Sequence, residues 1–260
     1  MNFLTLKGIN ILYSVQEGNQ KKDLPALVFI HGAGGDSTVW LNQLNHFKEK
    51  TDVYIPELPG HGQSRGSGAT SITEYAEIVK DLLDALDLTS ITLVGHSMGG
   101  AITQHLALSY PDRFKSIVLA STGARLRVSL EILNRIKNHF QEVVVTICDY
   151  GFGPEAPRDL IIQTQERLLR NSPEVLYRDF AACNQFDLME KVHHITLPTL
   201  ILCGEVDRLT PVKYSRYLHE QIPVSSLKLI EGAGHMVMLE KPDEFNRELE
   251  VFIERPVSPI

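Results

Sequence analysis

The chain has 260 residues, of which 43% are hydrophobic and 22% are charged, and its formal net charge is −7 at pH 7. This length can bury a substantial core, and the composition is that of a globular protein rather than a disordered one. The net negative charge, with no basic run longer than Lys21-Lys22, argues against nucleic acid and against a membrane surface as partners.

The three cysteines, Cys148, Cys183 and Cys203, are scattered singly and lack the spacing of a metal-binding motif. We therefore expect neither a disulfide framework nor a structural zinc site. Residues 1–5 lack the basic segment and apolar stretch of a signal peptide, and the longest apolar runs are far shorter than a membrane span. The sequence predicts a soluble, cytoplasmic protein.

The first part of the chain alternates strand-like and helix-like patterns. Residues 3–7 and 9–15 resemble a hairpin at the edge of a sheet. The elements predicted after it are a buried strand over 26–30, a helix starting near Asp36 or Ser37, a strand over 52–58 and a helix over 71–88. Glycine-rich loops follow both of these strands, at residues 31–35 and 59–64.

The stretch Ile91 to Ala101, ITLVGHSMGGA, is the centre of the sequence. A β-branched apolar run meets Gly95-His96-Ser97-Met98-Gly99, and an apolar helical pattern follows at once. Glycines two residues before and two residues after Ser97 are what a strained turn between strand and helix requires. Such a turn exposes the serine hydroxyl at the start of a helix, where the helix dipole favours negative charge.

The alternation continues with a strand over 116–120 and is then interrupted. Residues 122–194 carry only helical patterns, such as the apolar series from Leu130 to Ile147, which predicts a helical insertion. The alternation resumes with strands over 199–203 and 226–230, each followed by a helix, over 211–221 and 243–253. This rhythm predicts a mainly parallel α/β sheet.

Serine attacks a carbonyl only with a histidine that accepts its proton and a carboxylate that orients the histidine. In a parallel sheet the partners should lie on loops that follow other strands. Asp207 follows the strand over 199–203, and His235 follows the strand over 226–230. The chain order Ser97, Asp207, His235 is the order found in the α/β-hydrolase fold, and Glu205 is the main rival of Asp207.

The chain resembles an α/β-hydrolase over nearly its whole length. The motifs that carry the resemblance are His31-Gly32, Pro59-Gly60-His61-Gly62-Gln63-Ser64, Gly95-His96-Ser97-Met98-Gly99-Gly100, Gly204-x-x-Asp207 and Gly234-His235. The resemblance implies an eight-stranded, mostly parallel sheet flanked by helices, with residues 1–121 and 195–260 as the core. It also implies that residues 122–194, inserted after the sixth strand, form a lid over the active site.

The resemblance further implies an oxyanion hole formed by the backbone N–H groups of Ala33 and Met98. Esterases with a longer glycine run have glycine at the position of Ala33, although only the N–H is needed there. By this interpretation His31 and His61 shape their loops, and His96 is a packing residue rather than a base. Apolar residues of the insertion, Phe140 and Phe152 among them, are expected to pack, and part of them to line the substrate cavity.

Together these features predict a serine hydrolase that cleaves a small carboxylic ester through an acyl-enzyme, with no metal and no organic cofactor. Three alternatives keep the same triad: cleavage of a carbon–carbon bond, hydrolysis of a lactone, and perhydrolysis. A different alternative is a sensor that binds a ligand in a hydrolase pocket with little turnover. An intact triad favours an enzyme over a sensor.

Overall fold

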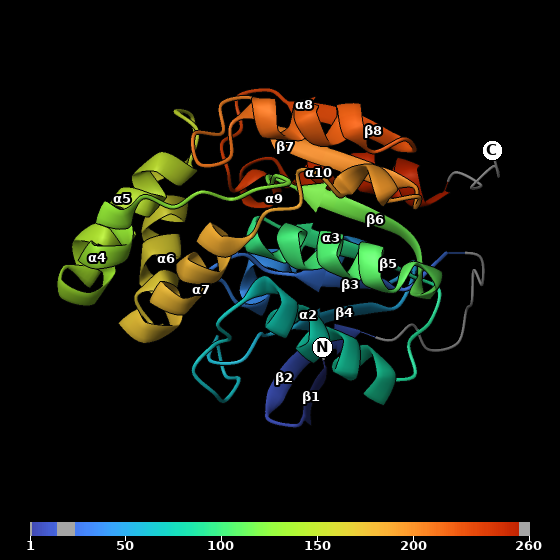
Figure 1. The fold of residues 1–260 in the computed structure, drawn as a ribbon, viewed down its shortest axis with the longest axis horizontal. Helices are drawn as coiled ribbons and strands as arrows, with labels where there is room; N and C mark the ends of the chain where they lie inside the picture. The colour runs from blue at the N-terminus through green and yellow to red at the C-terminus, as the bar shows by residue number, and fades with distance from the viewer. Residues whose placement is uncertain (1, 15–23, 255–260) are drawn as a thin grey trace.

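The computed structural model describes residues 2–14 and 24–254, so Val15, at the end of the predicted hairpin, lies outside the described residues. One eight-stranded sheet forms the centre of the molecule, with the order β1-β2-β4-β3-β5-β6-β7-β8 (Figure 1). Its strands are β1 (Asn2–Leu6), β2 (Ile9–Ser14), β3 (Leu27–Ile30), β4 (Val53–Pro56), β5 (Ile91–His96), β6 (Phe114–Ala120), β7 (Thr199–Gly204) and β8 (Ser225–Ile230).

The β1–β2 hairpin forms one edge of the sheet, as its alternating pattern predicts. β1 pairs with β2, and β2 with β4, in antiparallel register, whereas every pair from β4 to β8 is parallel. The parallel strands are covered on both faces. In β3, for example, Val28 and Ile30 pack into one apolar cluster while Leu27 and Phe29 pack into another. This explains why β3 reads as an uninterrupted apolar run.

Two layers of helices cover the sheet. The layer on one face consists of α2 (Ile72–Ala85), α3 (Met98–Ser109) and α8 (Val212–Gln221). The layer on the other face consists of η1 (Ser37–Trp40), α1 (Leu41–Phe47), α9 (Val237–Glu240) and α10 (Pro242–Glu254). Side chains cap two of these helices at their starts, because Asp36 accepts a hydrogen bond from the Thr38 N–H and Ser71 accepts one from the Glu74 N–H.

A helical insertion follows β6, in the place predicted for it. Its helices are α4 (Leu130–Asn138), α5 (Phe140–Gly151), α6 (Arg158–Leu168) and α7 (Pro173–Gln185), and the turn η3 (Val192–His194) leads back to the sheet. The four helices gather at one end of the sheet (Figure 1). They share a small apolar cluster of their own, which includes Ile136, Val144 and Leu176.

The three cysteines are free and buried. Among the helices of the two described ranges, none combines the length and the apolar character that crossing a bilayer requires.

Candidate active site

Ser97 lies between the end of β5 and the start of α3, in a strained turn. Its backbone has φ 52° and ψ −115°, outside the regions that non-glycine residues favour. The glycines around it are required by close packing. A Cβ on Gly95 would lie 2.2 Å from the Gly99 carbonyl oxygen, and a Cβ on Gly99 would lie 2.3 Å from the Ile30 oxygen. Larger residues would therefore push the turn apart.

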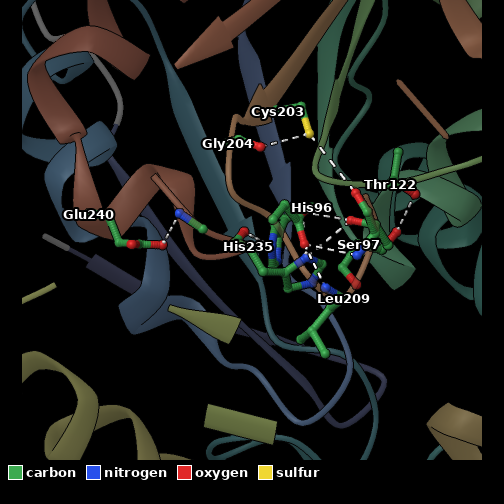
Figure 2. Close-up of polar contacts among 11 residues, drawn as sticks. His96, Ser97, Thr122, Cys203, Gly204, Leu209, His235 and Glu240 are labelled. Atoms are coloured by element: carbon green, nitrogen blue, oxygen red, sulfur yellow. Dashed lines mark hydrogen bonds and ion pairs between the residues drawn. The ribbon is translucent and has the colours of Figure 1, made fainter. Parts of the chain in front are cut away.

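Neighbouring segments fix the backbone of Ser97. Its N–H donates to the Ala120 carbonyl over 2.9 Å. The Thr122 hydroxyl donates to the Ser97 carbonyl over 2.8 Å (Figure 2). Met98 then opens α3, where the first N–H groups of a helix have no partner within the helix and favour an anion. The turn thus presents the serine beside a region of positive backbone potential.

Asp207 and His235 form a buried pair on the loops that follow β7 and β8. Asp207 Oδ2 lies 3.0 Å from His235 Nδ1, and Asp207 Oδ1 accepts hydrogen bonds from the Leu209 and Thr210 N–H groups. Burial opposes ionisation of Asp207, but the interaction with His235 and the hydrogen bonds from Thr210 outweigh it and lower the carboxyl pKa to about 2. Glu205, in the same loop, is exposed, whereas Asp207 is buried.

His96 holds the backbone of His235 and is itself neutral. Its Nε2 lies 3.0 Å from the His235 carbonyl oxygen, and because a carbonyl can only accept, this nitrogen carries the proton (Figure 2). Burial, and next the neighbouring His235, lower the pKa of His96 to about 3. A neutral ring that already donates to a carbonyl serves as a positioning group and not as a base.

The insertion also contacts the loop that carries His235. The His235 N–H donates to the Gly151 carbonyl over 2.7 Å. Glu240 joins the two sides, because its carboxylate accepts from the Gly153 N–H at 2.8 Å and from the Gly234 N–H at 3.0 Å. Burial raises the pKa of Glu240, while these donors oppose that effect. The position of the histidine thus depends on the end of α5.

The loop after β3 lies directly against Ser97. A Cβ on Gly32 would lie 3.1 Å from the Ser97 Cβ. His31 shapes this loop: its Nε2 accepts from the Leu58 N–H over 3.0 Å, so its Nδ1 carries the proton and donates to the Gly32 carbonyl over 2.9 Å. Burial, and next the charge of His61, lower the pKa of His31 to about 4, so the ring is neutral near pH 7.

A cavity of about 170 Å³ lies over Ser97 and His235, between the sheet and the insertion. Ala33 and Gly32 line it from the core. Its insertion side is largely apolar and includes Leu126, Val128, Ile132, Ile147, Cys148, Phe152, Leu168, Phe180 and Cys183. Of the two phenylalanines singled out in the sequence, Phe152 lines the cavity, whereas Phe140 packs against the insertion's own apolar cluster.

Comparison with known protein families gives a match over residues 27–248 to the group described as the alpha/beta hydrolase family. This chain belongs to the alpha/beta hydrolase family. The order of the sheet and the helical insertion after β6 are those of its fold. Residues 27–248 include the elbow at Ser97 and both loops that carry Asp207 and His235.

Several relatives of this chain have names that refer to esters or lactones. A solved thermophilic esterase is 35% identical, with a TM-score of 0.83 over 97% of this chain and 96% of the other. The 3-oxoadipate enol-lactonase 2 of Acinetobacter baylyi is 28% identical over 242 residues, which cover 90% of each chain. A solved N-acyl homoserine lactone degrading enzyme is 25% identical, with a TM-score of 0.83 over 97% and 100%.

Three residues of the candidate site could not be predicted from the sequence. Thr210 contacts Asp207, Glu240 supports the loop of His235, and Asp179 of α7 contacts the loop after β3. Asp179 lies 145 residues from Gly34, and Glu240 lies 87 residues from Gly153, so no local pattern predicts these contacts. Across residues 2–14 and 24–254, no group of three or more His, Cys, Asp or Glu side chains is arranged to hold a metal ion.

Proposed function

We propose that this alpha/beta hydrolase cleaves a carboxylic ester through an acyl-enzyme, with Ser97 as nucleophile, His235 as general base and Asp207 as the orienting carboxylate. The observation that carries the proposal is the buried contact of 3.0 Å between Asp207 and His235 Nδ1, next to a serine held in a strained elbow. An Nδ1 that donates to an ionised carboxylate leaves Nε2 free to accept a proton.

The chemistry follows from these groups. Ser97 Oγ attacks the ester carbonyl carbon as His235 Nε2 takes its proton, and the carbonyl electron pair moves to oxygen. The N–H groups of Ala33 and Met98 donate to this oxyanion. Collapse of the intermediate expels the alcohol, which receives the proton from His235. Water, activated by the same histidine, then releases the acid and restores Ser97.

The substrate class follows from the character of the cavity. Its walls on the insertion side are mainly aliphatic and aromatic, and Phe152 and Ile147 lie among them. Such walls favour an apolar acyl or alcohol group next to the scissile bond. The residues of the insertion therefore act as a lid that selects the substrate, while the loops of the sheet carry the chemistry.

A lactone is the second candidate substrate. A lactone is an internal ester, so the same triad opens it through the same intermediate, and the alcohol stays attached to the acyl group. Two of the relatives are named for lactone substrates, an enol-lactonase and an N-acyl homoserine lactone degrading enzyme. The two candidates differ only in what fills the cavity.

Labelling with a fluorophosphonate, followed by a substrate panel, tests the proposal. We expect rapid stoichiometric labelling at Ser97, which a ligand-binding sensor without an activated serine would lack. The panel consists of p-nitrophenyl esters from acetate upward, lactones and a ring-fission dienoate. Hydrolysis of esters supports the main proposal. A preference for a lactone would instead assign lactone hydrolysis, and a preference for the dienoate would assign cleavage of a carbon–carbon bond.

The variant Ser97→Ala tests the nucleophile. It should lower kcat by about 10⁴-fold or more, and activity above about a tenth of the wild type would refute the role of Ser97.

A further inference from the structure

Asp179 is a fully buried carboxylate that the proposed chemistry does not use. It lies on α7 of the insertion, with no exposed surface. Its Oδ1 accepts from the Tyr75 hydroxyl, and its Oδ2 accepts from the Gly34 N–H over 2.8 Å and from His61 Nε2 over 2.7 Å. One side chain of the insertion thus contacts three separate segments of the core.

His61 supplies the positive charge that a buried carboxylate needs. Its Nδ1 lies 3.1 Å from the Pro59 carbonyl oxygen and its Nε2 faces Asp179, so both ring nitrogens face acceptors and both carry protons. Burial acts against the charged ring, but Asp179 outweighs it and raises the pKa of His61. The neighbouring His31 stays neutral, so His61 is the one cation of the two histidines, and it faces the Asp179 carboxylate.

Gly34 is held on both of its polar groups by the insertion. Its N–H donates to Asp179, and its carbonyl accepts from Asn171 Nδ2 over 2.7 Å. Its φ of +66° is a conformation that suits glycine, and a Cβ there would lie 2.8 Å from the Leu176 side chain. The insertion therefore fixes both the position and the orientation of this residue.

Ala33 lies between Gly34, which the insertion holds, and Gly32, which the core holds. On its other side, the Gly32 carbonyl accepts from the Gly35 N–H over 3.0 Å and from His31 Nδ1 over 2.9 Å. The Ala33 N–H belongs to the Gly32–Ala33 peptide, so its direction is set by how the loop is held at Gly32 and Gly34. An oxyanion donor acts only within about 2.7–3.1 Å of the developing charge.

We propose that Asp179 and Asn171 are positioning residues, through which the insertion holds the Ala33 N–H at the oxyanion. This inference rests on the proposed function, because it takes Ala33 as an oxyanion donor. The insertion then has two roles, since it covers the substrate and holds one donor of the oxyanion hole in place. Removal of either contact leaves Ser97, Asp207 and His235 untouched and displaces one donor.

One variant removes a contact at Gly34, a second weakens the other contact, and two further variants serve as controls. Asn171→Ala removes the bond to the Gly34 carbonyl, and Asp179→Asn removes the negative charge that holds the Gly34 N–H. Tyr75→Phe removes a hydrogen bond to the same carboxylate on its other oxygen and leaves the Gly34 contact in place. Glu174→Gln alters an exposed ion pair with Arg178 on the same helix.

We expect kcat on an activated ester to fall by about 10- to 100-fold in Asp179→Asn and by about 3- to 10-fold in Asn171→Ala, with KM nearly unchanged. Tyr75→Phe should lower Tm while kcat stays close to that of the wild type, and Glu174→Gln should change neither. A purely structural role for Asp179 predicts that Tyr75→Phe and Asp179→Asn lose activity in proportion to their loss of Tm.

A trifluoromethyl ketone provides a direct readout of the oxyanion hole. Addition of Ser97 Oγ to its carbonyl carbon forms a hemiketal, the proton passes to His235 and the oxyanion occupies the hole. Its inhibition constant should rise in Asp179→Asn and Asn171→Ala by the factor by which kcat/KM falls. Unchanged kcat and unchanged inhibition in Asn171→Ala would overturn the proposal, even if Asp179→Asn fails to fold. Failure of the proposed function is distinct, because the wild type itself would then lack ester hydrolysis.

Discussion

Thr210 holds both oxygens of the Asp207 carboxylate. Its N–H donates to Oδ1 over 2.8 Å, and its hydroxyl donates to Oδ2 over 2.8 Å. The same hydroxyl lies 3.1 Å from His235 Nδ1, so one threonine contacts both members of the pair. The plane of the carboxylate is therefore set by Thr210, and the plane of the imidazole is set through it.

The first prediction concerns this hydroxyl. Thr210→Val preserves the shape of the side chain and removes the donor to Oδ2. A hydrogen bond to a charged group contributes about 1.5–3 kcal/mol, so we expect kcat to fall by about 10- to 100-fold. Thr210→Ser keeps the hydroxyl and should retain most of the activity. Equal rates for the valine variant and the wild type, measured on one activated ester, would contradict the role given to Thr210.

The second prediction separates the two carboxylates of the loop after β7. Asp207→Asn removes the charge that stabilises the imidazolium, so kcat should fall by about 10²- to 10⁴-fold with KM nearly unchanged. Glu205→Gln, at an exposed position, should cost less than about tenfold. Steady-state kinetics of both variants on the same ester decide the matter. The opposite ranking would transfer the role to Glu205.

The third prediction separates the two phenylalanines of the insertion. Phe152 lines the cavity, so Phe152→Ala should shift the preference among ester chain lengths while fluorophosphonate labelling of Ser97 stays rapid. Phe140 packs within the insertion, so Phe140→Ala should lower Tm and leave the preference unchanged. The matched pair is compared across the ester panel and by thermal unfolding. A larger shift in preference for Phe140→Ala would show that the cavity is bounded differently.

The fourth prediction concerns stability below neutral pH. Burial and nearby histidines lower the pKa of His96 to about 3 and that of His31 to about 4, from an ordinary value of 6.5. Between these folded values and 6.5 the unfolded chain binds more protons, so the free energy of unfolding falls as the pH falls through this window. His61, whose pKa is raised, acts in the opposite direction close to pH 6.5, where the folded chain holds more of its proton than the unfolded chain, and this effect fades at lower pH.

His96→Gln isolates one of these groups. It should reduce the dependence on pH by up to about 1.4 kcal/mol per pH unit within this window. Glu240, whose pKa is raised, acts in the opposite direction in both proteins, so its contribution cancels in the comparison. Urea unfolding of both proteins between about pH 5 and 6.5 gives the two slopes. Identical slopes would mean that His96 is not held neutral in the fold.

Most of the fold could be predicted because its elements are long and periodic. The exceptions have physical reasons. The apolar series from Leu130 to Ile147 reads as one helix, but the chain turns at His139, and the spacing continues across the break between α4 and α5. The helix expected after Asp36 begins as the 3₁₀ turn η1, and the four-residue helix α9 is too short for a periodic signal.

Part of the candidate site could be predicted from the sequence, and part of it could not. Ser97, Asp207 and His235 follow strands whose order along the chain could be read, so their meeting could be anticipated. Asp179 and Glu240 could not be found in this way, because each lies on a helix whose contacts depend on how the insertion packs. Phe140 and Phe152 are alike in sequence, and only the packing of α5 separates them.

The backbone with positive φ at Ser97 lowers the stability of the fold at the same residue that we propose as the nucleophile. A non-glycine residue held in such a conformation costs about 1–3 kcal/mol, which a glycine at the same position would largely recover. We therefore expect Ser97→Gly to melt at a higher temperature than the wild type, whereas Ser97→Ala keeps the strain. Selection for thermal stability alone would therefore favour glycine at this position, and the variant would lack the proposed nucleophile. Engineering for higher stability has to include a screen for activity at every round.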